Sequence, residues 1–176
     1  MKRYIVDYLF IPILLLAAII FDGAISVYTK NMFFTPDFIM VTQLFLTMLI
    51  MINFWIPRSH GVLLAIVFGL IYDAYYASVL SFYTVTFVAI LYMIKQIEPK
   101  LEKTFLTLVL VVAFSNFLCN LLQFFVALAI GIVDMSFFGY LVNKVIPTML
   151  LNIIYLFIVY KPFKAVFVFF NRIEDI

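Results

Sequence analysis

Apolar residues occupy long runs of this sequence, and short polar or proline-containing stretches separate the runs. About 20 consecutive apolar residues are enough for a helix to cross the hydrocarbon core of a bilayer. Four separations are clear, and they fall at residues 28–37, 57–61, 95–103 and 131–139. The runs between them predict membrane-spanning helices over about residues 8–28, 38–56, 104–130 and 140–160.

The remaining apolar run, residues 62–94, is too long for one untilted crossing and could hold one helix or two. Basic residues decide, because lysine and arginine collect in cytoplasmic loops. With two helices, over about 62–78 and 82–95, nine of the 11 basic residues face the cytoplasm, and Lys30 and Lys144 face outward. With one helix, seven would face outward. The sequence therefore predicts an all-α bundle of six transmembrane helices with both termini in the cytoplasm.

Residues 162–172 follow the last predicted crossing and begin with a proline. Phe163, Phe167 and Phe170 share one face of a helix, with cationic side chains beside them. This pattern favours an interfacial amphipathic helix over an extension of the preceding helix. The same face could also dock a cytoplasmic partner.

Composition supports a membrane protein. The chain has 176 residues, of which 68% are hydrophobic and 11% charged, and its mean hydropathy is +1.23. Soluble domains are roughly 45–50% apolar and about 25% charged, so a soluble fold is excluded. A net charge of +2 and long apolar runs also exclude a disordered or nucleic-acid-binding chain. Six crossings of about 20 residues leave little else, which predicts one transmembrane domain over residues 1–176, with its first helix retained rather than cleaved.

Residues that usually carry catalysis or bind metals are scarce. Cys119 is the only cysteine, His60 is the only histidine, and no glycine-rich phosphate loop occurs. The only histidine lies in a loop, and we assemble no nucleophile–base pair from the sequence. We therefore predict no metal, no cofactor and no enzymatic activity.

Small residues recur every four positions along the third predicted helix. They are Gly61, Ala65, Gly69, Asp73 and Ala77. Such a row lets a second helix backbone approach closely, which is how membrane helices pack. We interpret it as helix packing inside the bundle, with a partner contact as the alternative.

Three charged residues lie within predicted helices at similar depths from the outer surface. Asp22 and Asp73 each lie about six residues in, and Lys144 lies about five residues in, so their depths agree to within one turn. Charges in lipid need partners. We therefore expect Lys144 to neutralise one or both carboxylates in an intramembrane charge cluster. A structural buttress is the favoured role, and a proton or ion relay is the alternative.

Uncharged polar residues form stripes on the last two predicted helices. Asn116, Asn120 and Gln123 share a face of the fifth helix, and Thr148 and Asn152 follow Lys144 on the sixth. Pro147 is expected to bend the sixth helix. Such stripes usually join membrane helices through hydrogen bonds, and the alternative is that they line a ligand cavity.

Two short motifs resemble those of a known family. Residues 69–73, Gly-Leu-Ile-Tyr-Asp, resemble the Gly-Leu-x-x-Asp signature of the MreD family of bacterial rod shape-determining membrane proteins. Residues 147–152, Pro-Thr-Met-Leu-Leu-Asn, resemble the same family's Pro-x-x-Leu-Leu-Asn stretch. Length and predicted crossings fit as well, so the resemblance covers nearly the whole chain.

The resemblance implies a non-enzymatic role in the machinery that builds side-wall peptidoglycan from the bacterial cytoplasmic membrane. It implies MreC as the direct partner. Through MreC it implies the actin-like MreB, a SEDS glycosyltransferase and a penicillin-binding transpeptidase. Gly69, Asp73, Pro147 and Asn152 carry over as packing or partner-contact residues.

The family is also similar to the substrate-binding subunits of energy-coupling-factor vitamin transporters, which gives an alternative function. Those subunits dock through an Ala-x-x-x-Ala row on the first helix. Here Ala17 and Ala18 are followed four residues later by Phe21 and Asp22, so the row is absent. A channel is disfavoured because the aspartates lie at one level.

Overall fold

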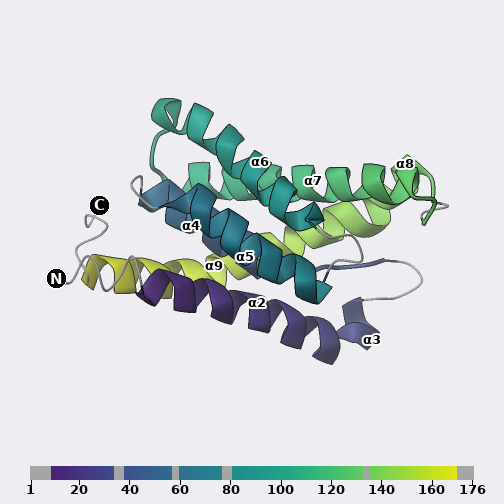
Figure 1. Ribbon diagram of the computed structural model, residues 1–176, viewed down its shortest axis with the longest axis horizontal. Helices are drawn as coiled ribbons and strands as arrows, with labels where there is room; N and C mark the ends of the chain where they lie inside the picture. Colours follow the sequence, from purple (N-terminus) through teal and green to yellow (C-terminus); the bar gives the residue numbers. More distant parts are fainter. Residues whose placement is uncertain (1–8, 34–37, 57–59, 77–80, 133–134, 170–176) are drawn as a thin grey trace.

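A computed structural model describes residues 9–33, 38–56, 60–76, 81–132 and 135–169 (Figure 1). The regular elements of these residues are helical: α2 (Ile11–Tyr28), α3 (Lys30–Phe33), α4 (Leu44–Trp55), α5 (Gly61–Tyr76), α6 (Phe82–Ile97), η2 (Glu98–Lys100), α7 (Phe105–Ala129), α8 (Phe137–Tyr140), η3 (Leu141–Val145) and α9 (Ile146–Phe169). The last three elements form one continuous helical rod, in which η3 is a π-helical turn. The predicted all-helical class is confirmed.

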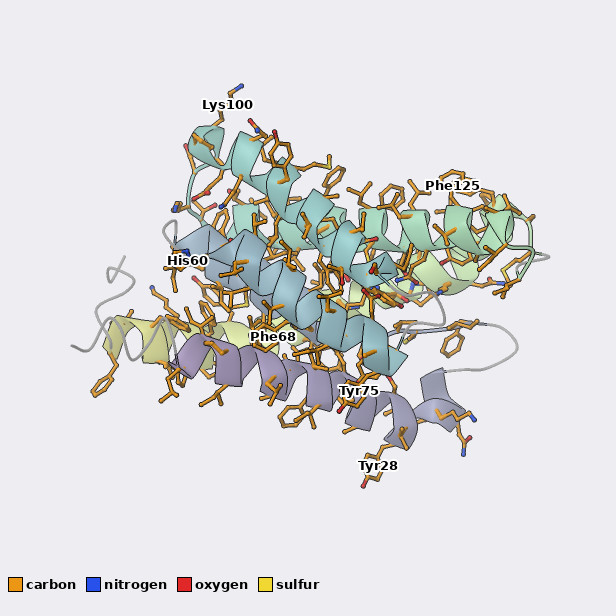
Figure 2. The ribbon with its side chains drawn as sticks, viewed as in Figure 1. Tyr28, His60, Phe68, Tyr75, Lys100 and Phe125 are labelled. Atoms are coloured by element: carbon orange, nitrogen blue, oxygen red, sulfur yellow. The ribbon has the colours of Figure 1, made fainter. Side chains whose placement is uncertain are left out.

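Three of these helical segments are long and apolar enough to cross a membrane. They are Ile11–Tyr28, Phe105–Ala129 and Phe137–Phe169, with 18, 25 and 33 residues. Apolar helices of 12 and 16 residues, α4 and α5, accompany them. Large side chains such as Tyr28 and Phe125 point away from the bundle and are 89% and 53% exposed (Figure 2). An apolar surface of this kind suits a protein surrounded by lipid.

The helical segments alternate in direction around α4 (Figure 1). Every residue of α4 is buried, because α2, α5, α7 and α9 all pack against it. The start of α2 and the end of α9 lie at the same end of the bundle, where the rings of Phe10 and Phe167 meet edge to face at 5.8 Å. The core of the protein is therefore built around a helix of only 12 residues.

The second predicted helix, 38–56, is shorter than expected. Its helical part begins at Leu44, and residues 38–43 are not helical. Twelve helical residues span only about 18 Å, which is less than the roughly 30 Å hydrocarbon core of a bilayer. The six non-helical residues before them can add up to about 20 Å. Such backbone is tolerated at membrane depth only where protein satisfies its polar groups. The prediction of an unbroken helix was wrong because side chains elsewhere in the sequence supply those partners.

The predicted interfacial helix over residues 162–172 was also wrong within the described residues. α9 continues through Pro162 to Phe169 as one helix. Proline removes one helical hydrogen bond, but Phe163 and Phe167 are buried beside α2 and α4. The burial of these two rings outweighs the hydrogen bond lost at Pro162. The last helix therefore extends through the proline, which was the alternative prediction. Phe170 lies outside the described residues.

The other predicted helices agree with the structure to within a few residues. The ranges 62–78, 82–95 and 104–130 correspond to α5, α6 and α7, although residues 77 and 78 lie outside the described part. The segment predicted over 140–160 begins three residues earlier, at Phe137. Ser136 caps this start by accepting a hydrogen bond from the N–H of Gly139 at 3.2 Å.

Candidate functional site

Asp22, on α2, caps the N-terminus of α4. Its two carboxylate oxygens accept hydrogen bonds from the backbone N–H groups of Leu44 and Phe45, at 2.8 and 3.0 Å. The Thr42 hydroxyl donates to the backbone carbonyl of Asp22 at 3.2 Å. The Asp22 side chain is 2% exposed, so the partial positive charge of a helix N-terminus stabilises this buried carboxylate.

Residues 39–43 are held along η3 and α9 by hydrogen bonds at alternate positions. The N–H of Ile39 donates to the carbonyl of Asn143 at 2.7 Å, and the N–H of Val41 donates to Oγ1 of Thr148 at 3.2 Å. The N–H of Gln43 donates to Oδ1 of Asn152 at 2.7 Å. We call this set of contacts the 39–43 seam. It satisfies backbone groups that would otherwise be stranded at membrane depth.

The Asn152 side chain makes hydrogen bonds with two residues of the 39–43 segment. While its Oδ1 accepts from Gln43, its Nδ2 donates to the Val41 carbonyl at 3.0 Å and to the Thr148 carbonyl at 2.8 Å. The side chain is fully buried. A carboxylate could not donate these bonds, and an aliphatic side chain could make none of them. The amide is therefore matched to this position.

Pro147 supplies a further seam contact by leaving a carbonyl free. Proline has no N–H, so the carbonyl of Asn143, four residues earlier, has no partner at position 147 of the helix. That carbonyl is the one that accepts the N–H of Ile39. The π-helical turn η3 lies over the same residues, 141–145. Pro147 and Asn152 of the sixth-helix motif thus serve one purpose, which is to hold the seam.

Asp73, on α5, caps the N-terminus of α6. Its carboxylate accepts hydrogen bonds from the N–H of Tyr83 at 2.7 Å, the N–H of Thr84 at 2.9 Å and the hydroxyl of Thr84 at 2.5 Å. Ser81 precedes α6 with φ of 67° and makes no side-chain cap of its own. Gly69 allows this approach, since a Cβ there would lie 2.9 Å from the Cα of Thr84. The two ends of the first motif therefore converge on Thr84.

The row of small residues packs inside the bundle over its described length. Gly61, Ala65, Gly69 and Asp73 are all buried. A Cβ at Gly61 would collide with the side-chain amide of Asn53 on α4, while Gly69 faces α6. Ala77 lies outside the described residues. These contacts correspond to helix packing, the favoured interpretation of the row.

Lys144 has partners other than the expected carboxylates. Its ammonium donates to Oε1 of Gln123 at 3.4 Å and lies 5.1 Å from the centre of the Tyr140 ring. Within the described residues the one salt bridge joins Lys103 to Glu98. The expected direct pairing of Lys144 with Asp22 or Asp73 is therefore not formed, because helix N-termini occupy both carboxylates.

A double-mutant cycle can measure whether Lys144 and Asp73 stabilise each other over a longer distance. We expect Lys144→Met, Asp73→Asn and the double variant to give additive losses of unfolding free energy, with coupling below about 0.5 kcal/mol. The measurement is SDS-induced unfolding of each purified variant in mild detergent. Coupling of 1 kcal/mol or more would mean that the two charges stabilise each other in spite of their separate partners.

The polar stripe of α7 bonds mainly to its own helix. Asn116 donates to the Val112 carbonyl at 2.9 Å, and Asn120 donates to the Asn116 carbonyl at 2.8 Å. The side-chain oxygens of these two asparagines are buried without a hydrogen-bond partner among the described residues. Contacts with other elements come from Gln123, which binds Lys144, and from the Asn120 carbonyl, which accepts from Tyr140 at 3.2 Å.

Sequence reasoning missed several members of the site. Thr42, Gln43 and Thr84 were not singled out, although all three are buried polar residues that contact the caps or the seam. A usable signal was the pair Thr42–Gln43 directly before an apolar run, because polar residues favour helix N-termini. In the part of the chain that the structure describes, no three His, Cys, Asp or Glu side chains gather in a group that could hold a metal ion.

Comparison with known proteins identifies the family. The model of the family described as rod shape-determining protein MreD matches residues 2–172. This chain belongs to the MreD family. In this MreD-family chain, the motif at residues 69–73 contains the aspartate that caps α6. The motif at residues 147–152 contains the asparagine that holds the 39–43 seam.

A curated relative agrees with this membership. The rod shape-determining protein MreD of Bacillus subtilis (strain 168) is 25% identical over 170 residues, which cover 95% of this chain and 94% of the relative. No solved structure matches the chain. The MreD-family chain is a membrane protein concerned with rod shape, and these comparisons give no support to a vitamin-transporter subunit.

Proposed function

We propose that this chain is a non-enzymatic component of the bacterial cell-elongation machinery. In this proposal it binds MreC and helps to position side-wall peptidoglycan synthesis. MreB, the SEDS glycosyltransferase and the penicillin-binding transpeptidase are reached through MreC. The single observation that carries the proposal is the family match over residues 2–172.

The proposed topology is six crossings with both termini in the cytoplasm. An even number of crossings is supported by the position of the start of α2 and the end of α9 at one end of the bundle (Figure 1). α4 needs residues 38–43 to complete its crossing, and α5 and α6 are short at 16 residues each. A locally thinned bilayer would accommodate such segments.

A non-enzymatic role is supported by the state of the two intramembrane carboxylates. The carboxylate oxygens of Asp22 and Asp73 accept hydrogen bonds from backbone N–H groups at helix N-termini. A general base needs a free lone pair directed at a substrate. In this proposal both residues stabilise the fold and neither acts on a substrate.

The buried position of the small-residue row has a consequence for partner binding. Because the row packs against α4 and α6, we propose that partners contact the outward-facing apolar side chains instead. Examples are Phe125 and Leu128 of α7, which are 53% and 50% exposed. Outward apolar surfaces of membrane helices associate by close van der Waals packing.

Co-purification tests the proposal. The tagged full-length chain is extracted from its native membrane in gentle detergent, beside a tagged helical membrane protein of another family. We expect MreC to be enriched at least about tenfold over that control, together with wall-synthesis enzymes. Recovery of a transmembrane energising subunit with paired ATPases and a bound vitamin, or absence of MreC, would contradict the proposal.

A further inference from the structure

An apolar groove of about 540 Å³ lies between α6 and α7. One wall consists of residues Ile90 to Ile97 of α6, and the other of residues Thr107 to Leu118 of α7, with Leu101 from the connecting loop. The two helices cross near the start of α6 and diverge toward the loop that joins them (Figure 1). The groove is therefore a wedge whose wide end meets this loop.

The length of the groove matches one leaflet of a bilayer. Its lining on α7 spans eleven residue steps, from Thr107 to Leu118, which is about 16 Å along a helix. The hydrocarbon core of a bilayer is about 30 Å thick. A partner helix that crosses the membrane would need a groove of about twice this length, whereas a lipid acyl chain occupies one leaflet.

The wide end of the groove carries an excess of positive charge. Within the loop, Lys103 and Glu98 form a salt bridge at 3.1 Å. Lys95, Lys100 and Glu102 remain and are exposed, which leaves two positive charges against one negative. Lys100 directly precedes the groove residue Leu101 in the sequence, and its side chain extends away from the bundle where α6 ends (Figure 2).

Charges fix this end of the groove at a membrane surface, because so many ionised side chains are not tolerated in hydrocarbon. Lysines at such a position attract lipid phosphate groups, and basic pockets between membrane helices bind anionic headgroups. Gln96 lines the same end and adds an amide donor. The groove thus presents an apolar wall one leaflet deep and a cationic rim, which is the amphipathic pattern of a phospholipid.

We propose that the groove between α6 and α7 binds one anionic phospholipid, with an acyl chain along the wedge and its phosphate at Lys100. This site is separate from the 39–43 seam and from both helix caps. It requires no protein partner, so it stands or falls independently of MreC binding.

Native mass spectrometry of the full-length chain tests the site. The probes are phosphatidylglycerol and phosphatidylcholine with identical acyl chains, added to the delipidated protein in mild detergent. We expect one phosphatidylglycerol per chain at concentrations where phosphatidylcholine is not retained. Lys100→Gln should weaken phosphatidylglycerol binding by about fivefold, which is the effect of one lysine near a phosphate. Lys161→Gln, an equal charge change at an exposed position of α9, should leave it unchanged.

Filling the groove provides the second arm of the test. Met93→Trp, from the α6 wall, and Leu110→Trp, from the α7 wall, should each displace the lipid, whereas Leu150→Trp on the exposed face of α9 should not. Thermal unfolding of each variant in the same detergent identifies any variant that fails to fold. The proposal requires that both folded groove variants lose phosphatidylglycerol binding. Equal retention of the two lipids, equal effects of Lys100→Gln and Lys161→Gln, or undiminished binding after filling would overturn the proposal. Site-specific cross-linking of a protein helix to Tyr92 in native membranes would also overturn it.

Discussion

Asn152→Leu is expected to lower the free energy of unfolding by about 2–6 kcal/mol. Leucine has a similar volume but leaves the Gln43 N–H and the Val41 carbonyl without the partners that they have at 2.7 and 3.0 Å. Each buried polar group left unsatisfied costs about 1–3 kcal/mol. The measurement is the midpoint and slope of SDS-induced unfolding in mild detergent.

Asn116→Leu is the matched control for this change. Asn116 is equally buried at 1% exposure, but its amide bonds only to the Val112 carbonyl of its own helix, and its oxygen has no partner in the described structure. Replacement of such a group by an apolar one is close to neutral or stabilising. Equal losses in the two variants would show that Asn152 has no special role in holding the seam.

Local release of the seam gives a second readout. In a Cys119→Ala background, Met40→Cys places a thiol in the half-buried segment beside the seam. We expect maleimide to label this thiol faster when Asn152 is also replaced by leucine, and unchanged labelling would mean that other contacts keep residues 39–43 in place. A smaller gain is expected for Thr148→Val, which removes one acceptor from the seam.

Asp73→Ala is expected to destabilise the fold by about 2–4 kcal/mol, the range for stranding two backbone donors in a partly buried site. The lost bonds run from the N–H groups of Tyr83 and Thr84 and from the Thr84 hydroxyl. Asp73→Asn should cost about half as much, since one acceptor oxygen survives while the new amide group faces donors. Unfolding in detergent measures both variants.

Glu102→Gln controls for the loss of a negative charge. Glu102 is exposed in the loop after α6, and surface substitutions of this kind stay within about 0.5 kcal/mol. MreC recovery should fall with Asp73→Ala in proportion to the loss of folded protein. If MreC recovery fell while stability were unchanged, Asp73 would have to contact the partner directly, and its role as an internal cap would be refuted.

The two family motifs have a common physical logic. Each helps to provide hydrogen-bond acceptors for backbone N–H groups at the start of another helical segment. The motif of α5 does so for α6 through Asp73, and the motif of α9 does so for the approach to α4 through Asn152. Helix starts inside a membrane have no water to bind their free N–H groups. This explains why such residues occur in an otherwise apolar chain.

Much of the fold could be predicted from the sequence because its signals are local. Runs of apolar residues indicate α2, α5, α6 and α7 to within a few residues, and Gly69 marks a close helix approach. The functional class came from the two motifs together with the composition. The buried polar residues were also found in large part, since polar groups in lipid require partners wherever they occur.

Partner choice could not be predicted in the same way. Asp22, Asp73 and Lys144 have similar depths, and opposite charges suggest pairing, yet the structure gives each a different partner. The N-terminus of a helix and the ammonium group of a lysine can both stabilise a carboxylate. Which of the two prevails depends on where the helices begin in space.

The sequence by itself determined that this chain is a helical membrane protein of the MreD family, because hydropathy and short motifs are properties of the chain alone. The tertiary structure alone decided that residues 38–43 leave the helix and that α9 continues through Pro162. In both places a local preference is overridden by distant residues: Asn143, Thr148 and Asn152 satisfy a non-helical backbone, and buried Phe163 and Phe167 stabilise a helix that proline weakens. Contacts of more than a hundred residues' separation outweigh local propensity there, and hydropathy does not record them.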